Sequence, residues 1–137
     1  MKNKKPSVCC IFNLGVHYKT SILKLLDEEF LVDFYFGDKL GLPIKKIDYD
    51  ELKGFKREVK NILLFGNFYW QKNMVKLIFK PYDYFLITGE PYCVSNWVIL
   101  FISKFLRKKT VLWSHGWYGN ETKIKIIIKK IFFNLSN

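Results

Sequence analysis

The feature that most constrains the fold is a regular alternation of two kinds of segment. Runs of β-forming residues take turns with segments whose apolar residues recur at helical spacing. This alternation is typical of β-α-β units, which build a parallel sheet with helices on both faces. We therefore predict an α/β fold: a Rossmann-like open parallel sheet of about five strands. The predicted strands span residues 7–14, 31–38, 58–68, 82–90 and 110–116.

The segments between these strands supply the predicted helices. A turn-rich connection over residues 39–55 contains Pro43, and Ser95 stands where an N-cap would precede the third helix. The length of 137 residues fits one domain, and we find neither an internal repeat nor a flexible linker in it. The predicted helices span residues 18–30, 69–80, 95–109 and 121–135.

The charge balance points to an anionic partner. The formal net charge is +11, which suits nucleic acid, an acidic lipid surface or a phosphorylated substrate. Arg57 and Arg107 are the only arginines, however, and nucleic-acid surfaces favour arginine forks for phosphate and guanine. We therefore expect no nucleic acid among the partners.

Cysteine usage and apolar run lengths favour a cytoplasmic protein. Cys9, Cys10 and Cys93 form no C-x-x-C pair, and a sparse, odd count fits a reducing compartment. The apolar N-terminal run predicts a buried first strand rather than a signal peptide, because Asn13 and Gly15 interrupt it. The apolar run at 97–106 is about half the length of a membrane span. Neither a dinucleotide fingerprint, nor a Walker loop, nor a metal-ligand pattern occurs, so we expect no bound cofactor or metal.

Three predicted strands end in residues that suit a binding site. In an open parallel sheet, ligands bind at the carboxyl ends of the strands, where the strand order reverses. The usual order places the first and fourth strands at that point and the fifth beside the fourth. The two histidines, His17 and His115, are therefore expected on the same rim. The three strand exits are residues 13–17, 88–90 and 114–116, and we predict substrate contacts from Gly15, His17, Gly89, Glu90 and Gly116.

Each of these residues also has a plainer interpretation. A glycine after a strand permits positive φ and close approach to a ligand, but it can also simply end the strand. The His115 ring can instead be satisfied by nearby backbone, and Glu90 is a base, a hydroxyl acceptor or a solvated charge. Trp70 and Gln71 suit a carbohydrate, although Trp70 equally suits the core. Ser114 and His115 are not a nucleophile pair, because neighbours on a strand point to opposite sides.

Four stretches together resemble a known family. In order and spacing, "LVDFYFGD", "FYWQK", "DYFLITGEPYCVSNWV" and "KKTVLWSHGWYGNE" resemble the N-terminal half of retaining GT-B-fold glycosyltransferases of the group 1 superfamily. The likeness is greatest to bacterial members that build surface polysaccharides. It implies that the chain is one half of a GT-B fold. It also implies transfer of a sugar from a nucleotide sugar, as co-substrate, to a glycan or lipid-linked acceptor.

The resemblance also implies roles for individual residues. His115 would be catalytic and would contact the transferred sugar, and Gly15 would lie near the donor diphosphate. Glu90 and Gln71 would contact the acceptor in the cleft. The sequence departs from the family in its first loop, which has one glycine and carries His17-Tyr18-Lys19 where an arginine often occurs.

A second departure is that the family's C-terminal nucleotide-sugar domain, with its E-x7-E motif, is absent from residues 1–137. Because transfer needs stabilised leaving-group charge, we expect the chain to be inactive alone. The alternative is a non-catalytic module, derived from a truncated glycosyltransferase, that binds a carbohydrate or a lipid surface. Lysines on the last predicted helix either rest on anionic headgroups at the inner face of the membrane or form a solvated face. They are Lys123, Lys125, Lys129 and Lys130.

Overall fold

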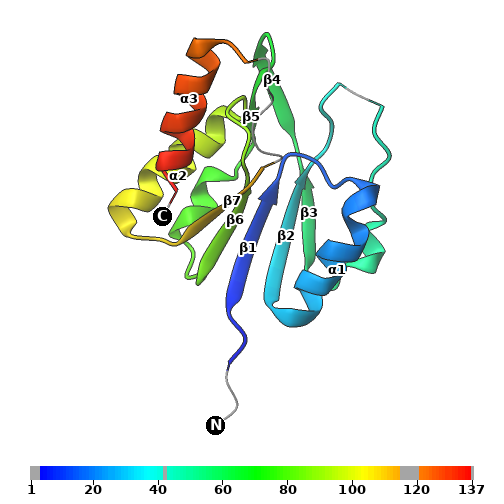
Figure 1. Ribbon diagram of the computed structural model, residues 1–137. Coiled ribbons are helices and arrows are strands. Elements are labelled where there is room, and N and C mark those ends of the chain that lie inside the picture. Colours follow the sequence, from blue (N-terminus) through cyan, green and yellow to red (C-terminus); the bar gives the residue numbers. More distant parts are fainter. Residues whose placement is uncertain (1–3, 42, 115–120, 137) are drawn as a thin grey trace.

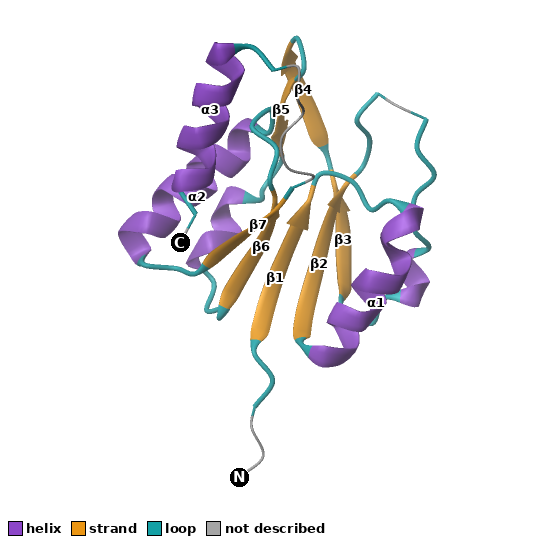
Figure 2. Cartoon of the chain, viewed as in Figure 1, coloured by secondary structure: helices purple, strands orange, loops and turns teal. Residues whose placement is uncertain are grey.

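A five-stranded parallel sheet forms the centre of the molecule, as Figures 1 and 2 show. The computed structural model describes residues 4–41, 43–114 and 121–136. Along the sheet the strand order is β3-β2-β1-β6-β7. The predicted α/β, Rossmann-like class is therefore confirmed. The strands are β1 (Ser7–Phe12), β2 (Leu31–Gly37), β3 (Phe55–Val59), β6 (Tyr84–Thr88) and β7 (Thr110–Trp113).

Helices cover both faces of this sheet, as predicted. Helix α1 (Thr20–Glu29) follows a short 3-10 turn and lies on one face, whereas α2 (Val94–Leu106) and α3 (Lys123–Asn134) lie on the other. Alternate residues of β1 point to opposite faces, so Cys10 packs with the α1 side and Cys9 with the α2 side. Both faces of the central strand are therefore buried, which explains its continuous apolar sequence.

The predicted third strand over 58–68 and the helix over 69–80 were wrong. The chain leaves β3 at Val59 and forms an antiparallel hairpin of β4 (Asn61–Phe65) and β5 (Phe68–Gln71). Gly66, at φ 52°, turns this hairpin, and Asn73, at φ 65°, ends the extended segment. Only a short 3-10 helix, Val75–Phe79, follows. Two left-handed residues thus interrupt what looked like one strand and one helix.

The N-cap assigned to Ser95 was also wrong. Cys93 is the N-cap of α2, and Ser95 lies fully buried inside the helix. Its hydroxyl oxygen accepts a hydrogen bond from the backbone N–H of Gln71, at 3.1 Å. Ser95 therefore joins α2 to the hairpin instead of starting the helix.

The strand order reverses between β1 and β6. The chain proceeds outward from β1 to β2 and β3, and then returns to place β6 on the other side of β1. This reversal is where open α/β sheets bind ligands. Within the described part of the chain, no helix combines the length and the apolar character needed to cross a bilayer.

Candidate functional site

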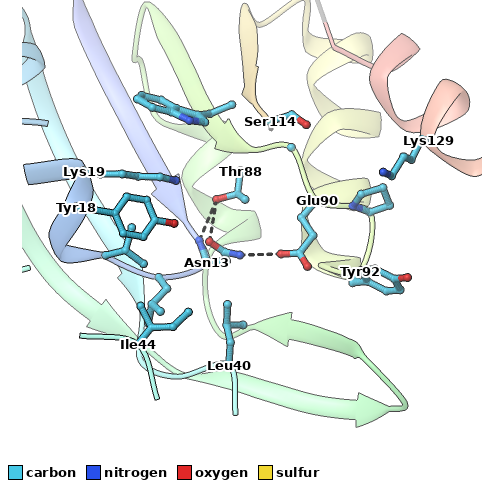
Figure 3. A pocket seen from close by; sticks show the side chains of 15 residues that line it. Asn13, Tyr18, Lys19, Leu40, Ile44, Thr88, Glu90, Tyr92, Ser114 and Lys129 are labelled. Carbon is cyan, nitrogen blue, oxygen red and sulfur yellow. Dashed lines mark hydrogen bonds between the residues drawn. The ribbon is translucent and has the colours of Figure 1, made fainter. Parts of the chain in front are cut away.

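A pocket of about 250 Å³ opens at the carboxyl ends of β1, β6 and β7, where the strand order reverses. Figure 3 shows lining side chains that come from the segments after these strands, from the segment after β2 (Leu40 and Ile44) and from α3 (Lys129). Residues of all three predicted strand exits therefore border this depression. The residues that line it include Asn13, Tyr18, Lys19, Thr88, Gly89, Glu90, Tyr92, Trp113 and Lys129.

Glu90 is held rigidly in the pocket. Its Oε2 accepts hydrogen bonds from the Asn13 side-chain amide at 2.7 Å and from the Tyr69 hydroxyl at 3.0 Å. Burial raises the pKa of Tyr69, so its phenol stays protonated and donates. No hydrogen bond from the described residues reaches Glu90 Oε1. That oxygen can therefore accept a ligand hydroxyl while the carboxylate keeps its orientation.

Asn13 is fixed on its other sides as well. Its backbone N–H donates to the Thr88 hydroxyl at 3.0 Å, and its carbonyl accepts from the Asn61 side-chain amide at 2.9 Å. A Cβ at Gly37 would lie 2.0 Å from the same carbonyl, so a side chain there would displace it. Asn13 was visible in the sequence as a polar residue ending an apolar strand, but Asn61 and Gly37 carried no comparable signal.

Gln71 does not line the pocket. The side chain is fully buried, and its amide N–H donates to the Phe12 carbonyl at 3.0 Å. Its Oε1 accepts from the Cys93 thiol at 3.8 Å. Burial raises the pKa of Cys93 to about 11, so the thiol remains protonated. In this geometry Gln71 joins β5 to β1 and α2, instead of presenting its amide to an acceptor in the cleft.

The two described rim glycines differ in position. Gly15 is buried and does not line the pocket, and an added Cβ would meet Ile47 and the Phe36 ring at 3.0 Å. Gly89 lines the pocket, and its Cβ would lie 2.9 Å from that of Ser114. Neither glycine adopts the positive φ that glycine permits after a strand. Both instead allow close packing of neighbouring segments.

The histidines do not define the pocket in the described residues. His17 is exposed and absent from the lining, and its Nδ1 lies 3.1 Å from the Lys45 carbonyl. The backbone N–H of His17 donates to the same carbonyl at 3.0 Å. The predicted catalytic His115 and its neighbour Gly116 lie outside the described residues. The expectation that the two histidines lie on the same rim therefore stays a prediction.

Lys19 was noted in the sequence only as part of the run that stands where the family often has an arginine, and no binding role was predicted for it. Its Nζ lies 5.3 Å from the centroid of the Phe12 ring and 5.2 Å from that of Trp113. These distances suit cation–π contacts. Burial lowers its pKa, and no described carboxylate lies within ion-pair distance of it. The pocket therefore contains a positioned cation that a ligand anion can reach.

Lys129 reaches the pocket from α3 and forms an ion pair with Glu121. Together with Glu90 and Lys19, it gives the pocket charges of both signs beside the aromatic rings of Tyr18, Tyr92 and Trp113. Such a lining suits a ligand that combines hydroxyl groups, an apolar ring surface and an anionic group. Among the described residues, no group of three His, Cys, Asp or Glu side chains could hold a metal ion.

No family model matches this chain, and comparison with curated proteins and with solved structures found no similar protein.

Proposed function

We propose that these residues form the acceptor-side half of a glycosyltransferase, which moves a sugar from a nucleotide sugar to a glycan or lipid-linked acceptor. The observation that carries the proposal is the fixed carboxylate of Glu90 in a pocket at the point of strand reversal. The resemblance of the "TGEP" and "WSHGWYG" blocks to group 1 glycosyltransferases supports it.

In the proposed complex, Glu90 Oε1 accepts a hydroxyl of the acceptor sugar. Asn13 and Tyr69 keep the carboxylate in place, and the nearby aromatic rings pack against the apolar face of the sugar. His115 would contact the transferred sugar, as the resemblance implies. Departure of the nucleoside diphosphate requires stabilised negative charge, which the opposing lobe of such enzymes supplies. We therefore expect residues 1–137 to bind acceptor without turnover.

The test is a titration of glycans into isotopically labelled protein, followed by NMR. A glycan that shifts the amide resonances of Asn13 and Thr88 should bind about tenfold more weakly to Glu90→Gln, because a hydrogen bond to a charged acceptor is lost. Glu29→Gln, at an exposed position on α1, is the matched control and should bind normally. The proposal fails if no glycan shifts these resonances, or if Glu90→Gln binds as tightly as the unmodified chain.

The second candidate is a non-catalytic module that binds carbohydrate or a lipid surface. One observation favours it: among the described lining residues Glu90 is the only carboxylate, and it is already engaged by Asn13 and Tyr69. A transfer assay separates the two candidates. The chain is mixed with a separately produced nucleotide-sugar-binding lobe, and release of nucleoside diphosphate is measured. Acceptor-dependent release that His115→Ala abolishes supports the enzyme, whereas glycan binding without release supports the module.

A further inference from the structure

Helix α3 exposes an apolar stripe on its outer side. The exposed fractions are 71% for Ile124, 57% for Ile127, 39% for Ile128 and 52% for Ile131. Their spacing of three, four and seven residues places them on one side of an α-helix, within an arc of about 100°. Isolated exposed aliphatic residues are ordinary, but a continuous helical stripe indicates a partner.

A neighbouring side of α3, next to the stripe, is the one that packs on the protein. Phe132 is fully buried, and its ring lies 5.1 Å from that of Trp97 on α2. Lys129 faces inward to Glu121 and the pocket. The helix is therefore apolar on two sides, and the isoleucine stripe is not needed to hold it in place.

The charges around the stripe are all positive. Lys123, Lys125 and Lys130 are exposed, and α3 contains neither Asp nor Glu. Along the sequence the net charge is concentrated toward the C-terminus: residues 91–137 carry eight Lys or Arg and a single acidic residue, Glu121. The eight are Lys104, Arg107, Lys108, Lys109, Lys123, Lys125, Lys129 and Lys130.

We propose that α3 docks in the plane of an anionic lipid bilayer, with the isoleucine stripe in the boundary between headgroups and acyl chains. A basic amphipathic helix of this kind binds by burying its apolar face while lysines contact anionic headgroups. With 12 residues α3 is about 18 Å long, which suits lying in the interface rather than crossing the membrane.

The charge pattern favours this occupant over two others. In a second copy packed stripe to stripe, the lysines of the two helices would come together without an acidic residue on either helix to pair with. A nucleic acid would contact the lysines but would leave the isoleucines without a partner. An anionic bilayer satisfies both features.

Of the four lysines expected at the headgroups, Lys129 points inward to Glu121, and the apolar contact comes from the isoleucines. The inference does not rest on the proposed sugar transfer, since none of the four isoleucines lines the pocket.

The experiment measures binding of the full chain to vesicles by co-sedimentation. Vesicles of phosphatidylcholine mixed with phosphatidylglycerol are compared with vesicles of phosphatidylcholine alone. We expect binding to the mixed vesicles that falls as salt is added. The double variant Ile124→Gln/Ile127→Gln should bind about tenfold more weakly, since it removes the two most exposed isoleucines of the stripe.

The matched control is Ile22→Gln/Leu25→Gln on α1, where the two side chains are 40% and 51% exposed. Helix α1 lies on the other face of the sheet, so this variant should bind vesicles normally. Circular dichroism checks that both variants keep their helices. The inference is overturned if the unmodified chain ignores mixed vesicles or if the α3 variant binds as the control does. It is also overturned if sedimentation velocity without lipid shows a dimer that the α3 variant abolishes.

Discussion

Replacing Gly37 by alanine should destabilise both the fold and the pocket. A Cβ there would lie 2.0 Å from the Asn13 carbonyl oxygen and 2.3 Å from the Asn61 amide nitrogen. An ordinary carbon–oxygen contact is about 3.3 Å, so the carbonyl must retreat by about 1.3 Å. Asn13 and Asn61 would then lose the hydrogen bond that joins them.

The cost follows from three contributions. Overpacking costs about 1–3 kcal/mol, and the lost hydrogen bond costs about 1 kcal/mol. Alanine lowers the conformational entropy of the unfolded chain, which offsets about 0.5 kcal/mol of this destabilisation. We therefore expect Gly37→Ala to lower the free energy of unfolding by about 2–3 kcal/mol. Gly41→Ala is the matched control: it has open space around it but a φ of 75°, so strain alone should cost about 1 kcal/mol.

Urea unfolding followed by far-UV circular dichroism measures both values. NMR of the labelled protein reports the local effect, because displacement of Asn13 should shift the amide resonances of Thr88 and Glu90. Equal destabilisation by the two substitutions, or unchanged Thr88 and Glu90 resonances in Gly37→Ala, would refute the close approach on which the reasoning depends.

Two further predictions concern charge and pH. Lys19→Met should weaken the binding of a sugar phosphate about tenfold and leave the binding of a neutral sugar unaffected. It should change the free energy of unfolding by about 1 kcal/mol or less, because burial already disfavours the charged amine. NMR titration and urea unfolding measure these effects, and equal losses for both ligands would contradict the anion contact. Burial raises the pKa of Cys93 to about 11, so the folded state holds this proton more tightly than the unfolded chain does. The stabilisation is complete below the unfolded thiol pKa of about 9 and is lost as pH rises toward 11, at about 1.4 kcal/mol per pH unit. Urea midpoints between these limits should therefore fall less steeply for Cys93→Ala than for the unmodified chain, and identical slopes would count against the buried thiol.

The parallel sheet was predictable because its strands are continuous apolar runs that alternate with segments whose apolar residues recur at helical spacing. Burial on both faces leaves few alternatives for a run such as residues 7–12. The β4–β5 hairpin was missed because Gly66 and Asn67 interrupt a run that otherwise looks like one strand. Asn73 adopts a left-handed conformation that its sequence neighbours do not indicate. Turns made of a single pair of residues are weak signals within β-forming sequence.

The location of the pocket was predictable, but side-chain direction was not. Gly89 and Glu90 follow β6, one of the two strands between which the strand order reverses. Their place at the carboxyl edge of the sheet therefore follows from the topology and does not depend on side-chain directions. Gln71 was expected in the cleft from the family resemblance, but it ends β5 and its side chain is fully buried outside the pocket lining. Lys19 was overlooked because its position depends on Trp113, which lies 94 residues later in the chain.

The hairpin has a mechanical consequence for the pocket. Its two strands hold the two halves of the Asn13–Glu90 pair separately: Asn61 of β4 grips one, and Tyr69 of β5 grips the other. At its far end the same hairpin exposes Leu63 and Phe65 to solvent. A tilt of the hairpin would therefore displace the donors to Asn13 and to Glu90 together. The orientation of the Glu90 carboxylate therefore depends on how firmly the β4–β5 hairpin is held against the rest of the protein.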